Sequence, residues 1–194
     1  MSKSQRRRRT LDIPSVVQIE GPAADRRAQA EDFVRDAFSV AYAARITHLM
    51  PTLMTLRHDS GRLLAVLGLR EPHEGELYLE HYLDRPVEQA LSQAAGCPVD
   101  RAALVEVGNF AVGAAGGGRW LITALTAYLH SAGRSWAVFT CGPELRNAFG
   151  RLGIALCDLG VADPGKLDPD ERASWGGYYA QSPRVMAASV AQSH

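Results

Sequence analysis

The sequence has few cysteines, no excess charge of either sign and no long apolar run. Its three cysteines, Cys97, Cys141 and Cys157, are scattered without a C-x-x-C pair, which argues against a disulfide framework and against a zinc site. The six histidines form no metal-spaced pair, so we expect no metal. Lys plus Arg and Asp plus Glu both number 21, so the whole chain carries no field that would attract nucleic acid.

Signals for membranes and export are also missing. The longest apolar-rich stretch, residues 120–129, is far below the ~20 residues that a membrane span needs. The charged N-terminus has no apolar run of about 7–15 residues behind it, as a secretory signal would have. We therefore expect a cytoplasmic protein without stable membrane insertion and without a nucleic-acid partner.

The 194 residues, with 46% apolar and 22% charged side chains, suit one globular domain. Five of the first ten residues are basic, Lys3 and Arg6 to Arg9. This run could be an arm for nucleic acid or for an anionic membrane, but a solvated tail is the simpler interpretation. We predict a disordered basic tail over residues 1–14 and a single domain over residues 15–190.

Hydrophobic periodicity and turn residues predict alternating strands and helices. Strands are expected over 15–20, 53–58, 63–69, 103–112, 135–140 and 154–159, with an extended segment over 77–83 and a last strand between 175 and 188. Helices are expected over 24–47, 87–95, 119–131 and 144–152. The first helix should bury an apolar stripe of Phe33, Ala37, Val40, Ala41 and Ala44. This order predicts a mixed α/β sheet flanked by helices.

The sharpest local feature is a glycine-rich loop between the strand over 103–112 and the helix that follows. It contains Gly113, Gly116, Gly117 and Gly118 and is followed by Arg119. Glycines let the free N–H groups of a helix start approach a phosphate, and an arginine adds a charged hydrogen bond. The spacing fits neither a P-loop nor a dinucleotide fingerprint. A flexible turn without a ligand is the alternative.

This strand–loop–helix unit resembles motif A of the Gcn5-related N-acetyltransferase superfamily, whose loop reads Gln/Arg-x-x-Gly-x-Gly/Ala. Gly116 and Gly118 match the two later positions, and Gly113 stands where Gln or Arg is usual. The resemblance implies that the loop from Gly113 to Arg119 binds the pyrophosphate of coenzyme A. It also implies that the preceding strand splays from its neighbour and pairs with pantetheine through Phe110, Ala111 and Val112.

A later segment, residues 145–154, resembles the helix of that superfamily that ends in Tyr-x-x-x-Gly-Phe. Phe149 stands where the tyrosine general acid is usual, so a simple tyrosine-assisted mechanism is not expected. Asn147 in this helix could contact the pantetheine arm, and a position on the helix surface is the alternative.

A scattered set of residues over about 15–188 resembles the thermostable hemolysin family. The set is Glu106-Val107-Gly108-Asn109, Arg119, residues 136–140, Leu145-Arg146-Asn147, Leu152-Gly153, Ala162-Asp163, Trp175-Gly176-x-Tyr178-Tyr179, Pro183 and Val185-Met186. The segment over 106–112 also resembles the Glu-x-Ser/Thr-Arg-Phe strand of acyl-homoserine-lactone synthases. These resemblances imply an α/β fold of the acyl-CoA N-acyltransferase type, with a mostly antiparallel sheet and splayed strands.

Three residues are the predicted catalytic group. Glu106 is a carboxylate in an apolar strand, and burial would raise its pKa and make it a better base for the amine. An outward-facing position paired with an arginine is the alternative. Asn109 could hydrogen-bond a carbonyl or the acceptor, or it could satisfy a β-bulge. Tyr178 could supply the proton that Phe149 cannot.

Aromatic residues are the predicted substrate pocket. Trp175, Tyr179 and Phe33 would line it, although aromatics at helical spacing are often core residues. We predict an acyltransferase that moves an acyl group from acyl-CoA, or from the phosphopantetheine of acyl carrier protein, to a small amine or amino acid. A non-catalytic acyl-CoA-binding module and the membrane-active protein that the family name implies are the alternatives. No feature indicates an oligomeric state.

Overall fold

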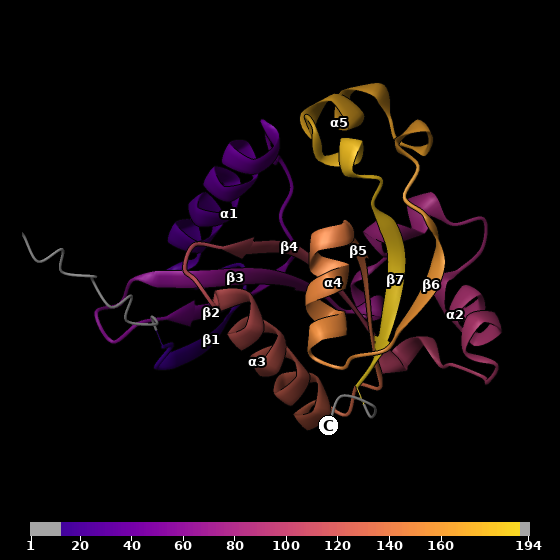
Figure 1. The fold of residues 1–194 in the computed structure, drawn as a ribbon, viewed down its shortest axis with the longest axis horizontal. Coiled ribbons are helices and arrows are strands. Elements are labelled where there is room, and N and C mark those ends of the chain that lie inside the picture. Colours follow the sequence, from indigo (N-terminus) through magenta and orange to yellow (C-terminus); the bar gives the residue numbers. More distant parts are fainter. Residues whose placement is uncertain (1–12, 191–194) are drawn as a thin grey trace, which may run out of the picture.

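The described part of the chain, residues 13–190 of a computed structural model, forms one seven-stranded sheet with helices on both faces (Figure 1). The tail predicted over 1–14 lies almost wholly outside the described residues. In chain order the strands and α-helices are β1 (Val16–Glu20), α1 (Arg27–Tyr42), β2 (Thr52–Arg57), β3 (Leu63–Arg70), α2 (Val87–Ala95), β4 (Leu104–Val112), α3 (Gly117–Ser131), β5 (Trp136–Cys141), α4 (Pro143–Arg151), β6 (Leu156–Val161), α5 (Pro169–Ser174) and β7 (Arg184–Ser189). Short 3-10 helices are η1 (Pro72–Glu74), η2 (Tyr78–Tyr82), η3 (Arg101–Ala103), η4 (Pro164–Lys166) and η5 (Tyr178–Gln181).

The strands lie in the order β1-β2-β3-β4-β5-β7-β6. Neighbouring strands are antiparallel except for β4 and β5, which are parallel and connected through α3. The mostly antiparallel sheet predicted from the resemblance is therefore confirmed.

Strands β4 and β5 part halfway along their length. They pair from Leu104 and Trp136 as far as Val107 and Phe139. Beyond this point β4 continues beside β3 to Val112, and β5 continues beside β7 to Cys141. The expected splay is confirmed, and it leaves a gap between two strands in the middle of the sheet.

Apolar side chains fill the space between the sheet and its helices on both faces. Helices α3 and α4 cover one face, where Leu121, Phe139 and Phe149 belong to the largest buried cluster (Figure 1). On the opposite face α1 packs over the N-terminal strands, and α2 with η2 packs over the C-terminal strands. The parting of β4 and β5 thus joins the spaces beneath two helical layers.

Helix α1 differs from its predicted form in both length and buried stripe. It ends at Tyr42, because Ala43 adopts a left-handed conformation with φ +53°. Ala30, Val34 and Phe38 make its buried apolar stripe, whereas Val40 is 90% exposed. The predicted stripe is thus wrong at Val40 and Ala41, which are exposed, whereas Phe33 and Ala37 are half-buried beside the cluster under α1 and Ala44 is buried just beyond the helix.

The prediction of an extended segment over 77–83 is wrong, because these residues form the 3-10 helix η2. The carboxylate of Glu106 accepts hydrogen bonds from the first N–H groups of this helix, at Tyr78 and Leu79. A side chain of β4 therefore stabilises the start of η2, although the residues of η2 themselves do not predict a helix. Of the other predicted elements, the first six strands and the helices after α1 agree with the structure within two residues, and the last strand, expected between 175 and 188, is β7.

Candidate active site

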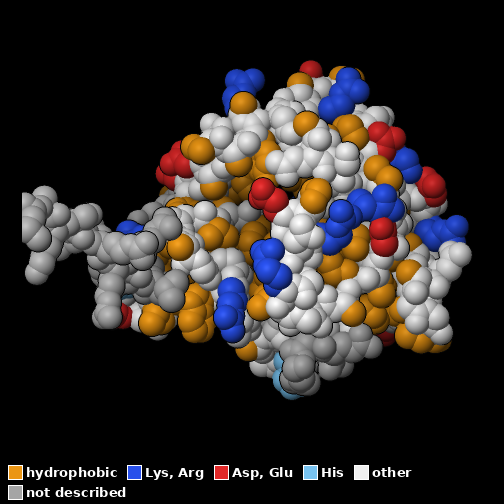
Figure 2. Space-filling view, viewed as in Figure 1, with side chains coloured by type: hydrophobic (Ala, Val, Ile, Leu, Met, Phe, Trp, Pro, Cys, Tyr) orange, Lys and Arg blue, Asp and Glu red, His pale blue; other side chains and the backbone are white. Residues whose placement is uncertain are grey.

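A cavity of about 530 Å³ lies where β4 and β5 part. Its apolar half, on the α3 and α4 face, is lined by Ile122, Leu125, Leu129, Phe139, Phe149 and Ile154. Its polar and aromatic half, on the α1 face, is lined by Tyr42, Met50, Arg70, Tyr78, Glu106 and Trp175. Figure 2 shows apolar side chains inside the hollow between α1 and α4. The cavity can therefore hold a molecule with one apolar end and one polar end.

Glu106 lies in the polar half, and its inward placement is confirmed by an exposure of only 2%. Its Oε2 accepts from the Tyr78 N–H at 2.8 Å and its Oε1 from the Leu79 N–H at 2.8 Å. Burial raises the pKa of Glu106, and this outweighs the two N–H groups and the positive charge of Arg70, which lower it. The outward-facing alternative is wrong, and the role as a base stays a prediction.

Asn109 lies in a β-bulge of β4, opposite the register shift between Val66 and Gly68. Its φ of +49° is left-handed, a conformation that asparagine tolerates better than most residues. Its side-chain Oδ1 accepts a hydrogen bond from the Met50 N–H at 2.9 Å. Asn109 lines the cavity and lies in a bulge, but its carboxamide oxygen binds the N–H of Met50, which lies before β2, and not the backbone of the bulge.

Of the aromatic residues predicted near the C-terminus, some line the cavity and one does not. Trp175 and Tyr178 line the cavity, whereas the hydroxyl of Tyr179 pairs with that of Tyr82. The Trp175 Nε1–H donates to the Tyr78 hydroxyl at 2.9 Å. Burial raises the pKa of Tyr178, chiefly by desolvating the phenolate, so this phenol is a weaker acid than free tyrosine. A role for Tyr178 as a proton donor stays a prediction.

Phe33 lies outside the cavity wall, against the glycine loop. A Cβ atom on Gly113 would lie 2.8 Å from Phe33 Cζ, so the ring occupies space that only glycine leaves open. Phe33 is half-buried and packs beside the buried cluster under α1. The structure thus places it as a support for the loop.

The loop joins β4 to α3 in a way that needs two further glycines besides Gly113. Gly116 has φ +83° at the start of α3. A Cβ on Gly117 would lie 3.0 Å from Val112 Cγ1 and 3.3 Å from the Leu64 carbonyl oxygen. A Cβ on Gly118 would make only ordinary contacts, none below 3.7 Å.

The predicted donor-binding residues divide between the cavity and its outside. Phe110, Ala111 and Val112 line the cavity, and the loop begins directly after Val112. The loop glycines and the exposed side chain of Arg119 lie beyond the cavity wall. The last residues of β4 therefore lead from the cavity to the loop.

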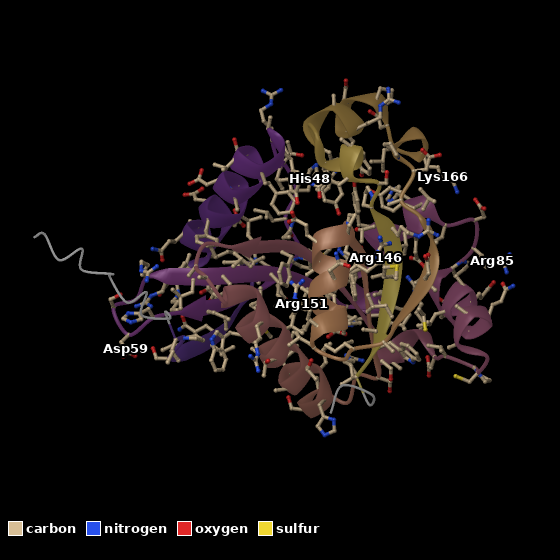
Figure 3. The ribbon with its side chains drawn as sticks, viewed as in Figure 1. His48, Asp59, Arg85, Arg146, Arg151 and Lys166 are labelled. Carbon is tan, nitrogen blue, oxygen red and sulfur yellow. The ribbon has the colours of Figure 1, made fainter. Side chains whose placement is uncertain are left out.

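Asn147 is exposed on α4 and lies outside the cavity wall. The same helix carries Arg146 and Arg151, which Figure 3 labels, and Arg151 lines the cavity. Met50, Arg70, Tyr78 and Arg151 are cavity residues that our sequence reasoning missed. Glycines inside the apolar strands β3 and β4 were the one available signal, because such glycines often mark a close approach by another group.

Neither a metal site nor a membrane span is evident in the described part of the chain. Across residues 13–190 no three His, Cys, Asp or Glu side chains form a group that could hold a metal ion. No helix in this range is both long and apolar enough to cross a membrane.

Solved structures define the class of fold. The AHL synthase LasI superposes with a TM-score of 0.60 and 14% identity, over 90% of this chain and 89% of that chain. FeeM, an N-acyl amino acid synthase from uncultured soil microbes, gives 0.58 and 18%, over 90% and 88%. The CoA-dependent acyl-homoserine lactone synthase MesI gives 0.55 and 15%, over 90% and 89%. The chain therefore has the α/β fold of the Gcn5-related N-acetyltransferase type that was predicted.

The family follows from the sequence. The model of the thermostable hemolysin family matches residues 21–194, so this protein belongs to that family, as the scattered motif residues indicated. A comparison with curated proteins finds no match.

Proposed function

We propose that this protein is an acyltransferase that moves an acyl group from a pantetheine thioester to an amine. The observation that carries the proposal is the cavity at the parting of β4 and β5, which has an apolar half, a polar half and a glycine loop beside it. The structural neighbours include AHL synthases and an N-acyl amino acid synthase, which supports the same chemistry here.

The donor, acyl-CoA or acyl carrier protein, would lie along the second half of β4. Its phosphates would meet the N-terminus of α3, where free N–H groups and the helix dipole favour negative charge, with Arg119 in the first turn. Its pantetheine arm would follow Phe110, Ala111 and Val112 into the cavity. This part of β4 pairs with β3 on one edge, whereas its other edge is no longer paired with β5, as it is earlier in the strand.

The acyl chain would occupy the apolar half of the cavity. There the rings of Phe139 and Phe149 stack with centroids 4.9 Å apart. Phe149 thus contributes an apolar surface at the position where the superfamily usually has tyrosine. Because each buried CH₂ contributes about 0.8 kcal/mol, donor affinity should rise roughly fourfold per methylene until the cavity is full.

The amine would enter the polar half, beside Glu106. Its nitrogen attacks the thioester carbonyl carbon, the C–S bond breaks, and the thiolate leaves with the electron pair. Glu106 would accept the proton that the amine loses, and Tyr178 would donate one to the thiolate. The phenol would then regain its proton from solvent.

The test combines purified protein with panels of acyl-CoA and acyl carrier protein thioesters and with mixed amines and amino acids. We expect steady release of free thiol that requires both an acyl donor and an amine, with N-acylated products detected by mass spectrometry. Donor binding without turnover would favour the binding-module alternative. Leakage of dye-loaded liposomes by the protein alone would favour the activity in the family name, and failure to bind any donor would reject the proposal.

A further inference from the structure

Two glycines form a notch beneath Met50 at the edge of the cavity, which Gly108 lines and Gly68 does not. Gly68 of β3 and Gly108 of β4 are direct cross-strand partners. A Cβ on Gly68 would lie 2.5 Å from the Cβ of Met50, and a Cβ on Gly108 would lie 2.5 Å from the Cε of Met50. The Met50 side chain therefore lies flat over this glycine notch (Gly68 and Gly108), in space that a side chain at either position would fill.

The backbone of Met50 is held at both of its polar groups. Its N–H donates to Asn109 Oδ1 at 2.9 Å, and its carbonyl oxygen accepts from Arg27 Nη2 at 2.7 Å. The nearly buried Arg27 also binds the next carbonyl, that of Pro51, at 2.7 Å. This pair of anchors fixes the segment before β2 over the sheet, so the position of Met50 is determined by residues from α1 and β4.

The notch lies next to the predicted base. Side chains two residues apart on a strand share a face of the sheet, so the next pair on the same face is Arg70 and Glu106. Met50, Arg70 and Glu106 all line the polar half of the cavity. An amine placed beside Glu106 and directed at the parting of β4 and β5 would therefore contact Met50.

We propose that Met50 determines the size of the amine that the site accepts, and this rests on the acyltransferase function proposed above. The side chain fills the notch down to the backbone of two strands, which leaves room beside Glu106 for a small primary amine. Removing it would open a hollow with no Cβ atom at its floor. The acceptor class is thus a primary amine with little bulk next to its nitrogen. Asn109 and Arg27 act as positioning residues, because they hold the backbone of Met50.

The first test measures kcat/KM for glycine or alanine and for phenylalanine or tryptophan as acceptors, with one acyl donor. In Met50→Ala the bulky-to-small ratio should rise by at least roughly 10-fold, because a single methylene in a pocket already changes such a ratio by about 10-fold to 200-fold. The KM for the donor should stay within a few-fold, and Met50→Leu should keep the wild-type ratio. An unchanged ratio in an active Met50→Ala protein would overturn the inference while the acyltransferase function stands.

A matched control is available in the neighbouring strand. Met54 is fully buried on the opposite face of the sheet and does not line the cavity, so Met54→Ala removes the same atoms elsewhere. We expect Met54→Ala to lower stability without changing the bulky-to-small ratio. A similar change of ratio in Met54→Ala would show that a general loss of packing, and not the loss of the Met50 side chain from the cavity, produced the effect.

A second measurement does not depend on turnover. The sequence has four methionines, so labelling their methyl groups with carbon-13 gives a simple spectrum, in which Met50→Leu assigns the Met50 signal. Small amines should shift the Met50 signal and leave those of Met54 and Met186, which do not line the cavity, in place. If no amine supports thiol release, the proposed function fails, and this titration still decides whether Met50 contacts an amine; no shift with any amine would overturn the inference.

Discussion

Glu106 has to satisfy two requirements with one carboxylate. Its oxygens hold the first two N–H groups of η2, and the same side chain faces the cavity where an amine would lose its proton. Each carboxylate oxygen has two lone pairs, so a backbone hydrogen bond on each does not exhaust its capacity to accept a proton. Burial raises the pKa of Glu106 above its ordinary value, which makes the carboxylate a stronger base than an exposed glutamate.

Glu106→Gln should therefore lower turnover by about 10²–10⁴, the usual contribution of general acid–base catalysis. The wild-type rate should rise with pH through one apparent pKa above the ordinary glutamate value, because only the ionised carboxylate accepts a proton, and the variant should lack this step. The amide cannot accept both N–H groups, so stability should fall by roughly 1–3 kcal/mol. The measurement is a pH–rate profile with one saturating amine.

The matched control for this prediction is Glu80→Gln. Glu80 also accepts backbone N–H groups near η2, from Leu77 and Val87, but does not line the cavity. This change should lower stability and keep the single step in the pH–rate profile, with its midpoint moved to lower pH because the negative charge of Glu80 raises the Glu106 pKa. A Glu106→Gln protein with full turnover and the wild-type profile would assign the carboxylate to structure alone.

At the scale of elements, Glu80 connects three short segments that the sheet does not pair. It accepts from the Leu77 N–H before η2, from the Val87 N–H at the start of α2, and from Arg101 in η3 at 2.6 Å. Burial by itself raises the pKa of Glu80. This effect is outweighed by the hydrogen bonds from Arg101, Val87 and Leu77 and by the charge of Arg101, so the Glu80 pKa falls from its ordinary value of 4.5 to about 2. One carboxylate thus stabilises the arrangement of the elements that carry Tyr78 and Tyr82.

This arrangement should make stability depend on pH in the acid range. A carboxyl whose folded pKa is below its unfolded value of 4.5 contributes stability above that value, and the contribution is lost as pH falls toward about 2. Urea unfolding between pH 2 and pH 6 should show this loss in the wild type and a smaller loss in Glu80→Gln. Equal slopes for the two proteins would contradict the assignment.

At the scale of the whole molecule, a donor that binds only the folded state should raise the melting temperature. At a concentration of about 100 times Kd, the stabilisation is about 2.7 kcal/mol, which for a domain of this size corresponds to roughly 5–10 °C. We expect this shift with acyl-CoA by differential scanning fluorimetry. The melting temperature of the ligand-free protein serves as the reference for each variant.

Substitutions in the glycine loop should separate donor binding from folding. Gly117→Asp places a Cβ near the Leu64 carbonyl and a negative charge near the donor phosphates, so its ligand-induced shift should be lost. Gly118→Ala makes only ordinary contacts and keeps its N–H, so its shift should remain. Equal shifts in both variants would place the donor phosphates away from the loop.

Much of the fold could be predicted because its signals are local. Turn residues, apolar periodicity and glycines act over a few residues. They placed the first six strands, the helices α2, α3 and α4, and the loop between β4 and α3 within two residues. The predictions failed where a distant partner decides the local structure. Segment 77–83 is helical because Glu106 binds its N–H groups, and the buried stripe of α1 depends on the sheet beneath it.

The candidate site shows the same division between sequence and tertiary structure. The sequence by itself determined the family, the glycine loop and the presence of one carboxylate in an apolar strand, because each is a pattern of neighbouring residues. Only the tertiary structure decided where β4 and β5 part, that Tyr179 faces Tyr82, and that Asn109 holds Met50 from 59 positions away. These contacts depend on strand register and on helix packing, which bring together side chains whose separation along the chain carries no local signal.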